Sequence, residues 1–332
     1  MKILVTGGCG FIGSNFIRHM LGKYSDYEII NLDALTYAGN MDNLKDLDNK
    51  RLRTVTDSIV NEEVVGTLIK EVDAVVDFAA ESHVDRSIAN AKPFLQTNII
   101  GLQTLLDAAM KAPNIKRFVH LSTDEVYGSL ETHDGKFTET TPLDPRSPYS
   151  ASKAAGDLIL QACNKTYGYG AILVRPSNNY GPYQFPEKLI PLMITNLMEG
   201  GSVPVYGKGE NVRDWLFVLD NCAAIDTILH NGKDGEVYNV GGDCERKNID
   251  IVKTTLGLMG KNESHIKYVT DRPGHDFRYA LDNTKITAEL GWKPSVKFEE
   301  GIEKTIEWYK GNQWWWQPLK SRLSHESGGF WK

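Results

Sequence analysis

Short, almost wholly apolar runs alternate with longer helical patterns through the first half of the chain. The apolar runs are KILVTGG, YEIINLD, AVVDFAA, RFVHLSTDEV and GAILVRP. Between them lie helical stretches such as IGSNFIRHMLGKY, PFLQTNIIGLQTLLDAAMKA and SASKAAGDLILQACNKTYG, the last beginning at about Tyr149. Strands that are apolar on both faces and separated by helices are typical of a parallel sheet covered on both sides. The pattern therefore predicts an α/β fold with a doubly wound parallel sheet of the Rossmann type.

The pattern changes after Arg175. The segment PSNNYGPYQFPEKLIP is dense in Pro, Asn and Tyr, which favours loop and short helix, whereas WLFVLDNCAAIDTILHN and EVYNVGG return to the earlier pattern. From about Asp243 a mixed segment runs to the Trp-rich end of the chain. We expect a Rossmann domain of residues 1–178 plus about 215–242. A smaller mixed α/β substrate-binding lobe, about 179–214 plus 243–332, would cover the carboxyl ends of the strands.

Composition and charge narrow the class of protein. The 332 residues are 41% hydrophobic and 24% charged, and their net charge is −6 without any run of Lys or Arg. This balance argues against nucleic acid or an anionic membrane surface as the main partner. No apolar run approaches the roughly 20 residues of a bilayer span, and MKILVTGG is typical of a strand rather than a signal peptide. We therefore expect a cytoplasmic protein.

Neither cysteine nor histidine spacing indicates a metal site. Cys9, Cys163, Cys222 and Cys244 are far apart in the chain and form no CxxC pair, and the eight histidines show no ligand spacing. Disulfide frameworks and zinc sites need closer or regular spacing. The sequence predicts reduced cysteines and no bound metal.

The segment VTGGCGFIGS carries the first candidate chemistry. It follows a strand, opens a helix and contains Gly7, Gly10 and Gly13. Glycines at this spacing let the backbone approach a pyrophosphate, which the helix N-terminus stabilises. Asp33, 20 residues after Gly13, is placed to accept hydrogen bonds from a ribose 2′-hydroxyl and would repel a 2′-phosphate. These residues predict NAD as the cofactor, and Asp57 and Ser58 in TDSI are placed to contact its adenine.

A second cluster indicates oxidation of a hydroxyl group. Tyr149 and Lys153 in YSASK are four residues apart and share one helix face. The lysine is expected to lower the pKa of the tyrosine, which can then take a proton from an alcohol while hydride leaves the carbon. Upstream, STDEVYG ends an apolar run with Thr123 and two adjacent acids, Asp124 and Glu125.

A dinucleotide-binding fold with Thr123, Tyr149 and Lys153 resembles the extended short-chain dehydrogenase/reductase family. The resemblance implies that Thr123 binds the substrate oxygen, that Tyr149 is the base, and that Lys153 tunes Tyr149 and holds the nicotinamide ribose. Within that family the chain resembles the dTDP-glucose 4,6-dehydratases, from the first strand to the second lobe. The segments that carry this are AAESHVDRS, TNIIGLQTLLDAA, STDEVYG, YSASKAAGD, NNYGPYQFPEKLIP, VYGKGENVRDWLFV and DRPGHD.

The resemblance implies an NAD-dependent hydro-lyase that converts dTDP-glucose to dTDP-4-dehydro-6-deoxy-glucose in deoxysugar biosynthesis. Oxidation at C4 acidifies the proton on C5, a carboxylate removes that proton, and a carboxylic acid protonates the departing C6 hydroxyl. The hydride then returns to C6. Neighbouring carboxyls titrate apart, which suits one base and one acid. By resemblance, Glu125 is the base and Asp124 the acid.

The resemblance also assigns contacts to other positions. Arg213 is expected to bind the diphosphate, and Pro204 and Tyr206 to flank the base. The remaining substrate contacts would be Ser82, Thr123, Asn178, Glu187, Lys188, Leu189, Asn248, Arg272 and His275. Besides the residues already named, the cofactor contacts would be Phe11, Ile12, Ala34, Leu35, Thr36, Phe78, Ala79, Ala80, Glu81, Thr97, Tyr149, Lys153 and Asn179. We expect His83, Asp85 and Arg86 to have structural roles.

Other functions remain open at this point. A 4,6-dehydratase for a UDP-, CDP- or GDP-hexose would need the same residues, because uridine differs from thymidine by one methyl and one hydroxyl. A nucleotide-sugar 4-epimerase or decarboxylase would not need an acid for C6, and a non-catalytic NAD-sensing regulator could dispense with Tyr149, Lys153 and both acids.

The helical stretches at 93–110 and 150–168 carry more apolar surface than one sheet face needs. Related proteins pair these helices in a four-helix bundle, so a homodimer is expected.

Overall fold

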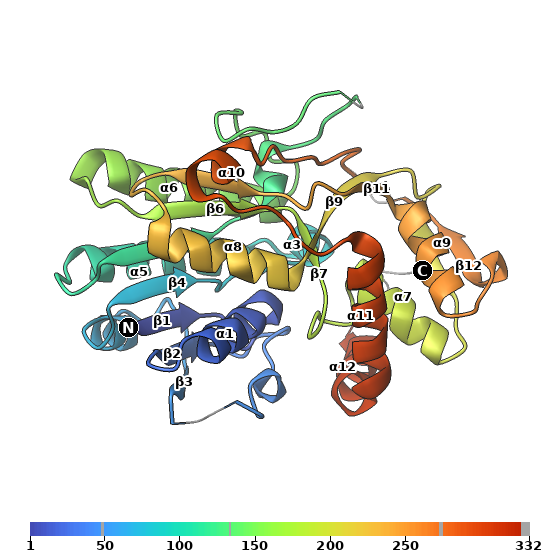
Figure 1. Cartoon of the computed structure of the whole chain (residues 1–332), viewed down its shortest axis with the longest axis horizontal. Helices are drawn as coiled ribbons and strands as arrows, with labels where there is room; N and C mark the ends of the chain where they lie inside the picture. Colours follow the sequence, from blue (N-terminus) through green and yellow to red (C-terminus); the bar gives the residue numbers. More distant parts are fainter. Residues whose placement is uncertain (48–49, 133, 272–274, 327–332) are drawn as a thin grey trace.

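A computed structural model describes residues 1–47, 50–132, 134–271 and 275–326. Its centre is a seven-stranded sheet in which every neighbouring pair is parallel, with the order β10-β6-β5-β4-β1-β2-β3 (Figure 1). The strands are β1 (Lys2–Thr6), β2 (Glu28–Asp33), β3 (Leu52–Thr56), β4 (Ala74–Asp77), β5 (Arg117–Leu121), β6 (Ile172–Pro176) and β10 (Val237–Val240). This sheet confirms the predicted doubly wound fold of the Rossmann type.

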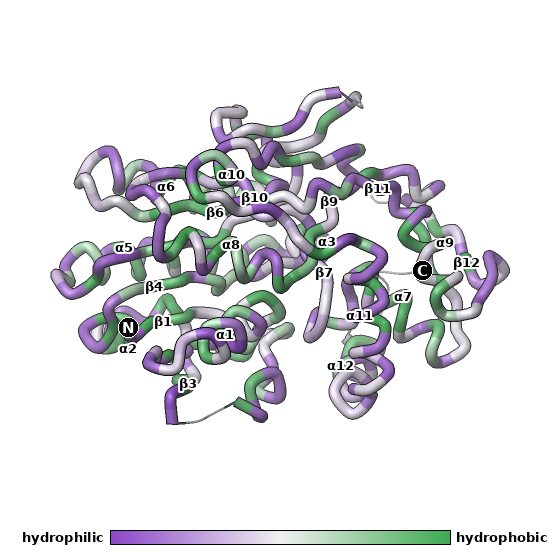
Figure 2. Tube along the Cα trace, in the orientation of Figure 1, coloured by the Kyte–Doolittle hydropathy of each residue, from purple (hydrophilic) through white to green (hydrophobic). Residues whose placement is uncertain are grey.

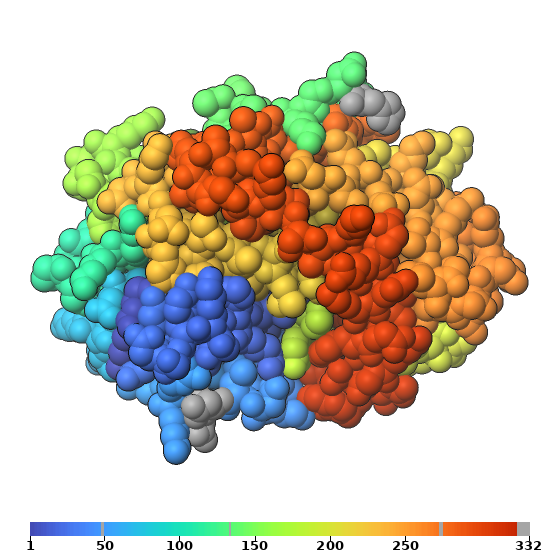
Figure 3. Space-filling view, in the orientation of Figure 1, coloured from blue at the N-terminus to red at the C-terminus, as the bar shows by residue number. Residues whose placement is uncertain are grey.

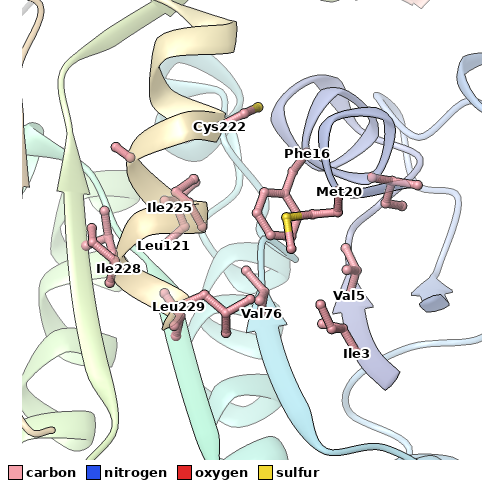
Figure 4. Packing of buried hydrophobic residues seen from close by; sticks show 14 of the residues in the cluster. Ile3, Val5, Phe16, Met20, Val76, Leu121, Cys222, Ile225, Ile228 and Leu229 are labelled. Carbon is pink, nitrogen blue, oxygen red and sulfur yellow. The ribbon is translucent and has the colours of Figure 1, made fainter. Parts of the chain in front are cut away.

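Helices cover both faces of the large sheet because its strands are apolar on both sides. One face is covered by α1 (Phe11–Lys23) and α8 (Val218–Asn231), whose apolar side chains interlock with those of β1, β4 and β5 (Figure 4). The opposite face packs against α2 (Glu62–Ile69), α5 (Leu102–Met110) and α6 (Pro148–Tyr167). The carboxyl ends of the strands stay uncovered by these helices and are available for ligands.

The helical pattern at 93–112 is more irregular than a single helix. It begins with α4 (Lys92–Leu95), passes through the π-helical segment η2 (Gln96–Gly101) and continues as α5. Before it lies the short α3 (Val84–Ala89). Single π-turns inside α-helices are frequently found at functional sites.

A smaller lobe lies beyond the carboxyl ends of the large sheet (Figure 1). It has one sheet of β11 (Glu245–Lys247), β9 (Val212–Phe217) and β7 (Asn178–Tyr180), and a second of β12 (Ile266–Val269) and β8 (Val203–Tyr206). Its own apolar cluster contains many aromatic side chains. The helices of this part are α7 (Leu189–Met198), α9 (Asn248–Leu258), α11 (Phe298–Gly311) and α12 (Gln313–Glu326).

Two segments cross the predicted division into lobes. β9 includes residues 215–217 and pairs with β7 and β11 rather than with the large sheet. α10 (Thr284–Leu290) contacts β10 and α8, and its Ile286 belongs to the apolar cluster of the large sheet. The exact boundaries of the two lobes therefore stay a prediction.

The C-terminal helix α12 packs against the N-terminal part of the chain. Trp315 on α12 donates its indole N–H to Asn43 (2.7 Å), and Arg322 donates to the backbone oxygen of Tyr37 (3.0 Å). The space-filling view shows the red C-terminal helix against the blue segment near residue 40 (Figure 3).

Hydrophobic positions concentrate in central elements such as β4, and outer turns are largely hydrophilic (Figure 2). No helix among the described residues is long and apolar enough to cross a membrane.

Candidate active site

The glycine turn after β1 brings two backbones into close contact at the edge of the sheet. Gly7 has a φ of +68°, and a Cβ there would lie 2.8 Å from the backbone of Ala79. A Cβ on Gly13 would collide with the carbonyl oxygen of Gly7. Gly10 caps α1 without a side-chain hydrogen bond, so the N–H groups of the first turn can bind an anion. The turn fits the pyrophosphate of a dinucleotide.

Asp33 ends β2 beside this turn. Its carboxylate oxygens accept the backbone N–H groups of Leu35 (2.8 Å) and Cys9 (2.8 Å). Burial raises the pKa of Asp33, and these two hydrogen bonds act in the opposite direction. The carboxylate is thereby held next to the glycine turn, where its remaining lone pairs can accept the hydroxyl groups of a ribose.

A pocket of about 1140 Å³, including space open to solvent, runs along this edge of the sheet. Most residues that the sequence predicted for the dinucleotide line it, namely Gly7, Gly10, Phe11, Ile12, Gly13, Asp33, Ala34, Thr36, Asp57, Ser58, Phe78, Ala79, Ala80, Glu81 and Thr97. Tyr149 and Lys153, also predicted as cofactor contacts, are not among the lining residues. Leu35 is not among them either and instead donates its backbone N–H to Asp33. We call this space the cofactor pocket.

The cofactor pocket also contains residues that the sequence did not indicate. Ser82 and Lys188, predicted for the substrate, line it. Tyr37, Ala38 and Gly39 follow Asp33 in the turn DALTYAG, and the glycine was a signal that this turn approaches the site. The other lining residues could not be recognised from the local sequence, because they are apolar or come from distant loops. They are Leu32, Ile59, Leu121, Gln184 and Phe185.

The π-helical segment η2 fixes one wall of this pocket. Thr97 lines the pocket, and its neighbour Asn98 is 1% exposed. The Asn98 side chain accepts from the backbone N–H of Glu81 (3.0 Å) and donates to its carbonyl (3.1 Å) and to Ser152 (2.9 Å). Asn98 thus ties the pocket wall to α6, a role that sequence reasoning missed.

The start of α6 positions the predicted tyrosine and lysine. Ser147 and Ser150 form a capping box around the first turn, and Pro148 is the first helical residue. Tyr149 and Lys153 follow on one face, both almost fully buried. The structure therefore brings the two side chains to the same end of the sheet as the glycine turn.

The electrostatics of Tyr149 differ from the expectation. Its pKa lies above the ordinary value because burial and then the Glu125 carboxylate disfavour phenolate, whereas the hydrogen bond with Thr123 acts in the opposite direction. The Lys153 ammonium is engaged elsewhere, because Nζ donates to the backbone oxygen of Leu121 (2.7 Å) and to His120 (3.2 Å). The expected lowering of the tyrosine pKa by Lys153 is not seen in this arrangement.

The two adjacent acids have different surroundings. They follow β5 in the short helix η3 (Asp124–Tyr127), where Thr123 donates to Asp124 (3.2 Å) and accepts the backbone N–H of Glu125 (3.3 Å). Asp124 is 2% exposed, and its Oδ2 has no hydrogen-bond partner among the described residues. Burial, then Glu125 and Asp214, raises the pKa of Asp124 well above its usual range. Glu125, in contrast, lines a second pocket.

This second pocket, about 1050 Å³ including open space, lies between the large sheet and the smaller lobe. We call it the substrate pocket. The predicted substrate residues that line it are Asn178, Glu187, Lys188, Leu189, Pro204, Tyr206, Arg213, Asn248 and His275. Because Lys188 lines both pockets, the two spaces meet at this residue.

Arg213 supplies positive charge inside the substrate pocket. It is 5% exposed, its hydrogen bonds go to the backbone oxygens of Val212 (2.8 Å), Phe277 (3.5 Å) and Asp276 (3.1 Å), and its guanidinium lies over the Tyr279 ring at 4.2 Å. No carboxylate of the described residues forms an ion pair with it. A buried guanidinium in this situation favours an anionic ligand such as a phosphate.

Buried polar atoms in the same pocket also lack partners. Among the described residues, Oδ1 of Asn178, Oδ1 of Asn248 and Oε1 of Glu187 accept no hydrogen bond. Burial raises the pKa of Glu187, which Lys188 and Arg86 oppose. Buried polar atoms are normally satisfied, so these three point to a polar ligand.

Several residues lie in other places than the sequence analysis predicted. His83 and Asp85, expected to be structural, line the substrate pocket, and the His83 ring lies 3.4 Å from Glu187. Asn179 lines neither pocket, and its side chain donates to Ser177 (2.9 Å) and accepts from Asn221 (2.8 Å). Arg272 lies outside the described residues. Lining residues that the sequence did not indicate are Val84, Leu192, Val205, Gly209, Trp215, Val252 and Tyr279.

Metal ligation finds no support in the described ranges. Within residues 1–47, 50–132, 134–271 and 275–326, no three His, Cys, Asp or Glu side chains are grouped as a metal site would need.

Known proteins match the chain over nearly its whole length. The family model described as GDP-mannose 4,6 dehydratase matches residues 4–305. A dTDP-glucose 4,6-dehydratase of Streptomyces niveus is 49% identical over 326 residues, 97% of this chain and 96% of that protein. The crystal structure of dTDP-glucose 4,6-dehydratase from Bacillus anthracis in complex with NAD has a TM-score of 0.90 and 52% identity, covering 96% of this chain and 99% of that chain. DesIV, a dTDP-glucose 4,6-dehydratase from Streptomyces venezuelae solved with NAD bound, has a TM-score of 0.92 and 49% identity over 96% of this chain and all of its own.

Proposed function

This chain belongs to the family described as GDP-mannose 4,6 dehydratase, and we infer that it is an NAD-dependent hydro-lyase that dehydrates dTDP-glucose to dTDP-4-dehydro-6-deoxy-glucose. Such a product is an intermediate of deoxysugar biosynthesis. The observation that carries the reaction type is the adjacent pair of acids after β5, in which a buried Asp124 lies beside Glu125, a residue that lines the substrate pocket. A hydro-lyase needs an acid and a base at adjacent carbons, and this pair supplies both.

NAD bound in the cofactor pocket would supply the hydride chemistry, with hydride taken from C4 of the sugar and returned to C6, while the Glu125 carboxyl gives a proton back to C5. The residues that we propose to hold NAD are the glycine turn, which faces the pyrophosphate, and Asp33, which faces the ribose. Thr123 and Tyr149 bind the C4 hydroxyl, and Tyr149 removes its proton. The positive nicotinamide would act against the burial that raises the pKa of Tyr149.

Elimination is assigned to the two acids. We propose that Glu125 removes the proton from C5, which the C4 ketone has acidified, and that Asp124 gives its proton to the departing C6 hydroxyl. The C5–H bond supplies the electron pair of the new double bond, and the C6–O bond breaks with its own pair, so that one water leaves. The raised pKa of Asp124 favours the protonated form that this step needs.

The nucleotide part of the substrate is assigned to the smaller lobe. Arg213 binds the diphosphate, with Asn248 and His275 beside it, and Pro204 and Tyr206 flank the base. Lys188, at the junction of the pockets, lies where sugar and nicotinamide meet. Relatives that are 49% identical to this chain are named dTDP-glucose 4,6-dehydratases. Their names support thymidine as the nucleoside of the substrate.

We also propose that the chain forms a homodimer and works in the cytoplasm. Leu95 on α4, Ile100 in η2 and Leu158 on α6 are 46%, 48% and 56% exposed. These helices contact one another on one side of the sheet, so their exposed side chains can form a shared apolar face. A second copy of the same face is the simplest cover for it.

The test is a product assay in heavy water with dTDP-, UDP-, CDP- and GDP-hexoses. The expected product of dTDP-glucose has lost one water and carries deuterium at C5. Faster conversion of another nucleotide would reassign the base. An isomer of unchanged elemental composition would instead support a 4-epimerase and overturn the dehydratase.

A further inference from the structure

Behind Lys153 a buried chain of hydrogen bonds runs through three strands of the large sheet. Thr6 on β1 donates to Asp77 on β4, Asp77 Oδ2 lies 2.6 Å from His120 Nδ1 on β5, and His120 Nε2 lies 3.2 Å from Lys153 Nζ. The exposed fractions of the four side chains are between 0% and 2%. Of these four residues only Lys153 has a role implied by the family resemblance, and Thr6, Asp77 and His120 have none.

The chemistry of the atoms fixes the direction of each bond. A carboxylate only accepts, so His120 Nδ1 carries the hydrogen that faces Asp77. Nε2 of the neutral ring is then an acceptor for the Lys153 ammonium. The ammonium has three N–H donors, and two are used by His120 and the Leu121 carbonyl. One N–H remains for a partner in the active site.

The other end of this chain supports the wall of the cofactor pocket. The backbone N–H of Ala79 faces Thr6 Oγ1 (3.3 Å) and Asp77 Oδ1 (3.2 Å). Phe78 and Ala79 line the cofactor pocket, and Ala79 touches the backbone of Gly7. One hydrogen-bonded unit thus sets both the pocket wall and the position of the lysine ammonium.

We propose that Asp77 and His120 are positioning residues for the oxidation step, which hold the Lys153 ammonium in register with Tyr149 and the cofactor pocket. The inference rests on the proposed function where activity is measured. A simple structural role for the same pair predicts lost stability with no specific effect on the oxidation.

Electrostatics adds a second part to this role. The titratable groups that act on Lys153 are Asp77 on β4, His120 on β5 and Asp157 on its own helix. Burial lowers the pKa of Lys153, and Asp77 and Asp157 act in the opposite direction. Asp157 already pairs with Arg175 at 2.8 Å, so Asp77 is the carboxylate whose charge is directed along the chain to Lys153.

The pKa of His120 is consistent with a neutral ring. Burial and then the Lys153 charge lower it, and Asp77 opposes this. The pKa of Asp77 is itself lowered, because the contacts with His120 and Thr6 outweigh the effect of burial. The pair is therefore a carboxylate and a neutral imidazole at neutral pH.

The first variant is Asp77→Asn, which keeps the volume and removes the charge. The proposal requires the remaining Lys153 N–H to stabilise the Tyr149 phenolate once NAD is bound, a contact that the structure without NAD does not contain. Less ammonium at a given pH would weaken this stabilisation, so the pH profile of NADH formation in single turnovers should move upward by roughly one unit. At neutral pH this is about a tenfold loss in rate that shrinks as the pH rises. The KM for the sugar nucleotide should not change, since neither residue lines the substrate pocket.

A matched control is Asp226→Asn on α8. Asp226 is also a buried carboxylate in contact with a histidine, with Oδ2 2.9 Å from His19 Nε2, but it lines neither pocket. It should leave the pH profile unchanged. His120→Gln, which can still accept from Lys153, should lose less at neutral pH than Asp77→Asn. A uniform loss at all pH values in Asp77→Asn, or an equal shift in Asp226→Asn, would overturn the proposal.

Nitrogen NMR of labelled histidine gives a readout that does not depend on turnover. His120, assigned by its loss in His120→Gln, should be neutral with Nδ1 protonated at neutral pH, and Asp77→Asn should alter its signals. A charged ring, or a proton on Nε2, would contradict the arrangement. If the unaltered chain released no water from dTDP-glucose, the proposed function would fail, and this spectrum would still decide the positioning inference.

Discussion

The cofactor pocket and the substrate pocket are built in opposite ways. Residues 7–121 supply most of the cofactor pocket, from the ends of adjacent strands β1, β2 and β4. The substrate pocket takes residues from His83 to Tyr279, and its walls come from the smaller lobe as well as from η3. A pocket made from neighbouring strand ends leaves a compact motif in the sequence. A pocket made from distant segments leaves only scattered polar residues.

We expect the reaction to take place where the cofactor pocket and the substrate pocket meet. Lys188 lines both pockets, and Glu125 enters the substrate pocket from the same segment as Thr123. The oxidation is therefore expected to depend on residues of the sheet domain, and substrate affinity on the smaller lobe. The following changes separate those two dependencies.

The largest effect is expected from Glu125→Gln. The variant should still form NADH from NAD and dTDP-glucose, because Tyr149 remains, but elimination should slow by about 10² to 10⁴, the usual contribution of a general base. NADH absorbance in a single turnover and product mass check this. Glu131→Gln, at an exposed position, serves as the control. If Glu125→Gln cannot reduce NAD, the assignment of Glu125 to elimination is wrong.

Arg213→Gln should affect only the substrate side. Loss of a charged hydrogen-bonding group costs about 1.5 to 3 kcal/mol, so KM for dTDP-glucose should rise by roughly 10- to 100-fold while the affinity for NAD stays the same. Arg246 on β11 is the cross-strand neighbour of Arg213 and lies outside the substrate pocket. Arg246→Gln is therefore the matched control. An equal rise in both variants would mean that the lobe had been disturbed as a whole.

The acid role of Asp124 predicts a pH dependence. Its pKa is raised, so it stays protonated above the ordinary range of a carboxyl and loses its proton as the pH rises through the raised value. Elimination should then fall by up to about tenfold per pH unit, whereas NAD binding should not. The native state also holds this proton where the unfolded chain has lost it, so the free energy of unfolding should fall with rising pH between the ordinary pKa of a carboxyl and the raised pKa of Asp124, below the range in which elimination falls.

The stability part of this prediction has its own comparison. In urea titrations the loss of stability with rising pH should be smaller in Asp124→Asn, which has no proton to release at this position. Equal slopes for the two chains would show that Asp124 does not carry a raised pKa. Activity of the variant should be low at every pH, because an amide cannot supply the proton.

The smallest change is expected on the cofactor side. Asp33→Asn should weaken the binding of NAD by about tenfold at most, because the glycine turn still binds the pyrophosphate. It should also reduce the preference for NAD over NADP. Fluorescence titration with both dinucleotides measures this. Asp46→Asn, in which the replaced carboxylate pairs with Arg18 outside the pocket, is the control. A loss of dTDP-glucose affinity instead would contradict the separation of the two pockets.

Sequence reasoning was most effective where one local interaction decides the structure. The apolar runs predicted the strands because a strand buried on both faces cannot carry many polar residues. Gly7 and Gly13 were identifiable because no other residue fits so close to a neighbouring backbone. The fold and the use of NAD, seen also in solved relatives, followed from these features. The lobe boundaries were harder to infer, since an apolar segment such as WLFV can join either sheet.

What the sequence determined by itself is the order of strands and helices, the glycine turn with Asp33, and the spacing of Tyr149 and Lys153. Each depends on residues close together in the chain. Only the tertiary structure decided the state of the charges. Burial among groups from distant segments raises the pKa of Asp124 and of Tyr149, and it joins Lys153 to His120 and Asp77. Desolvation and Coulomb interactions depend on what surrounds a group in space, and the local sequence does not contain that information.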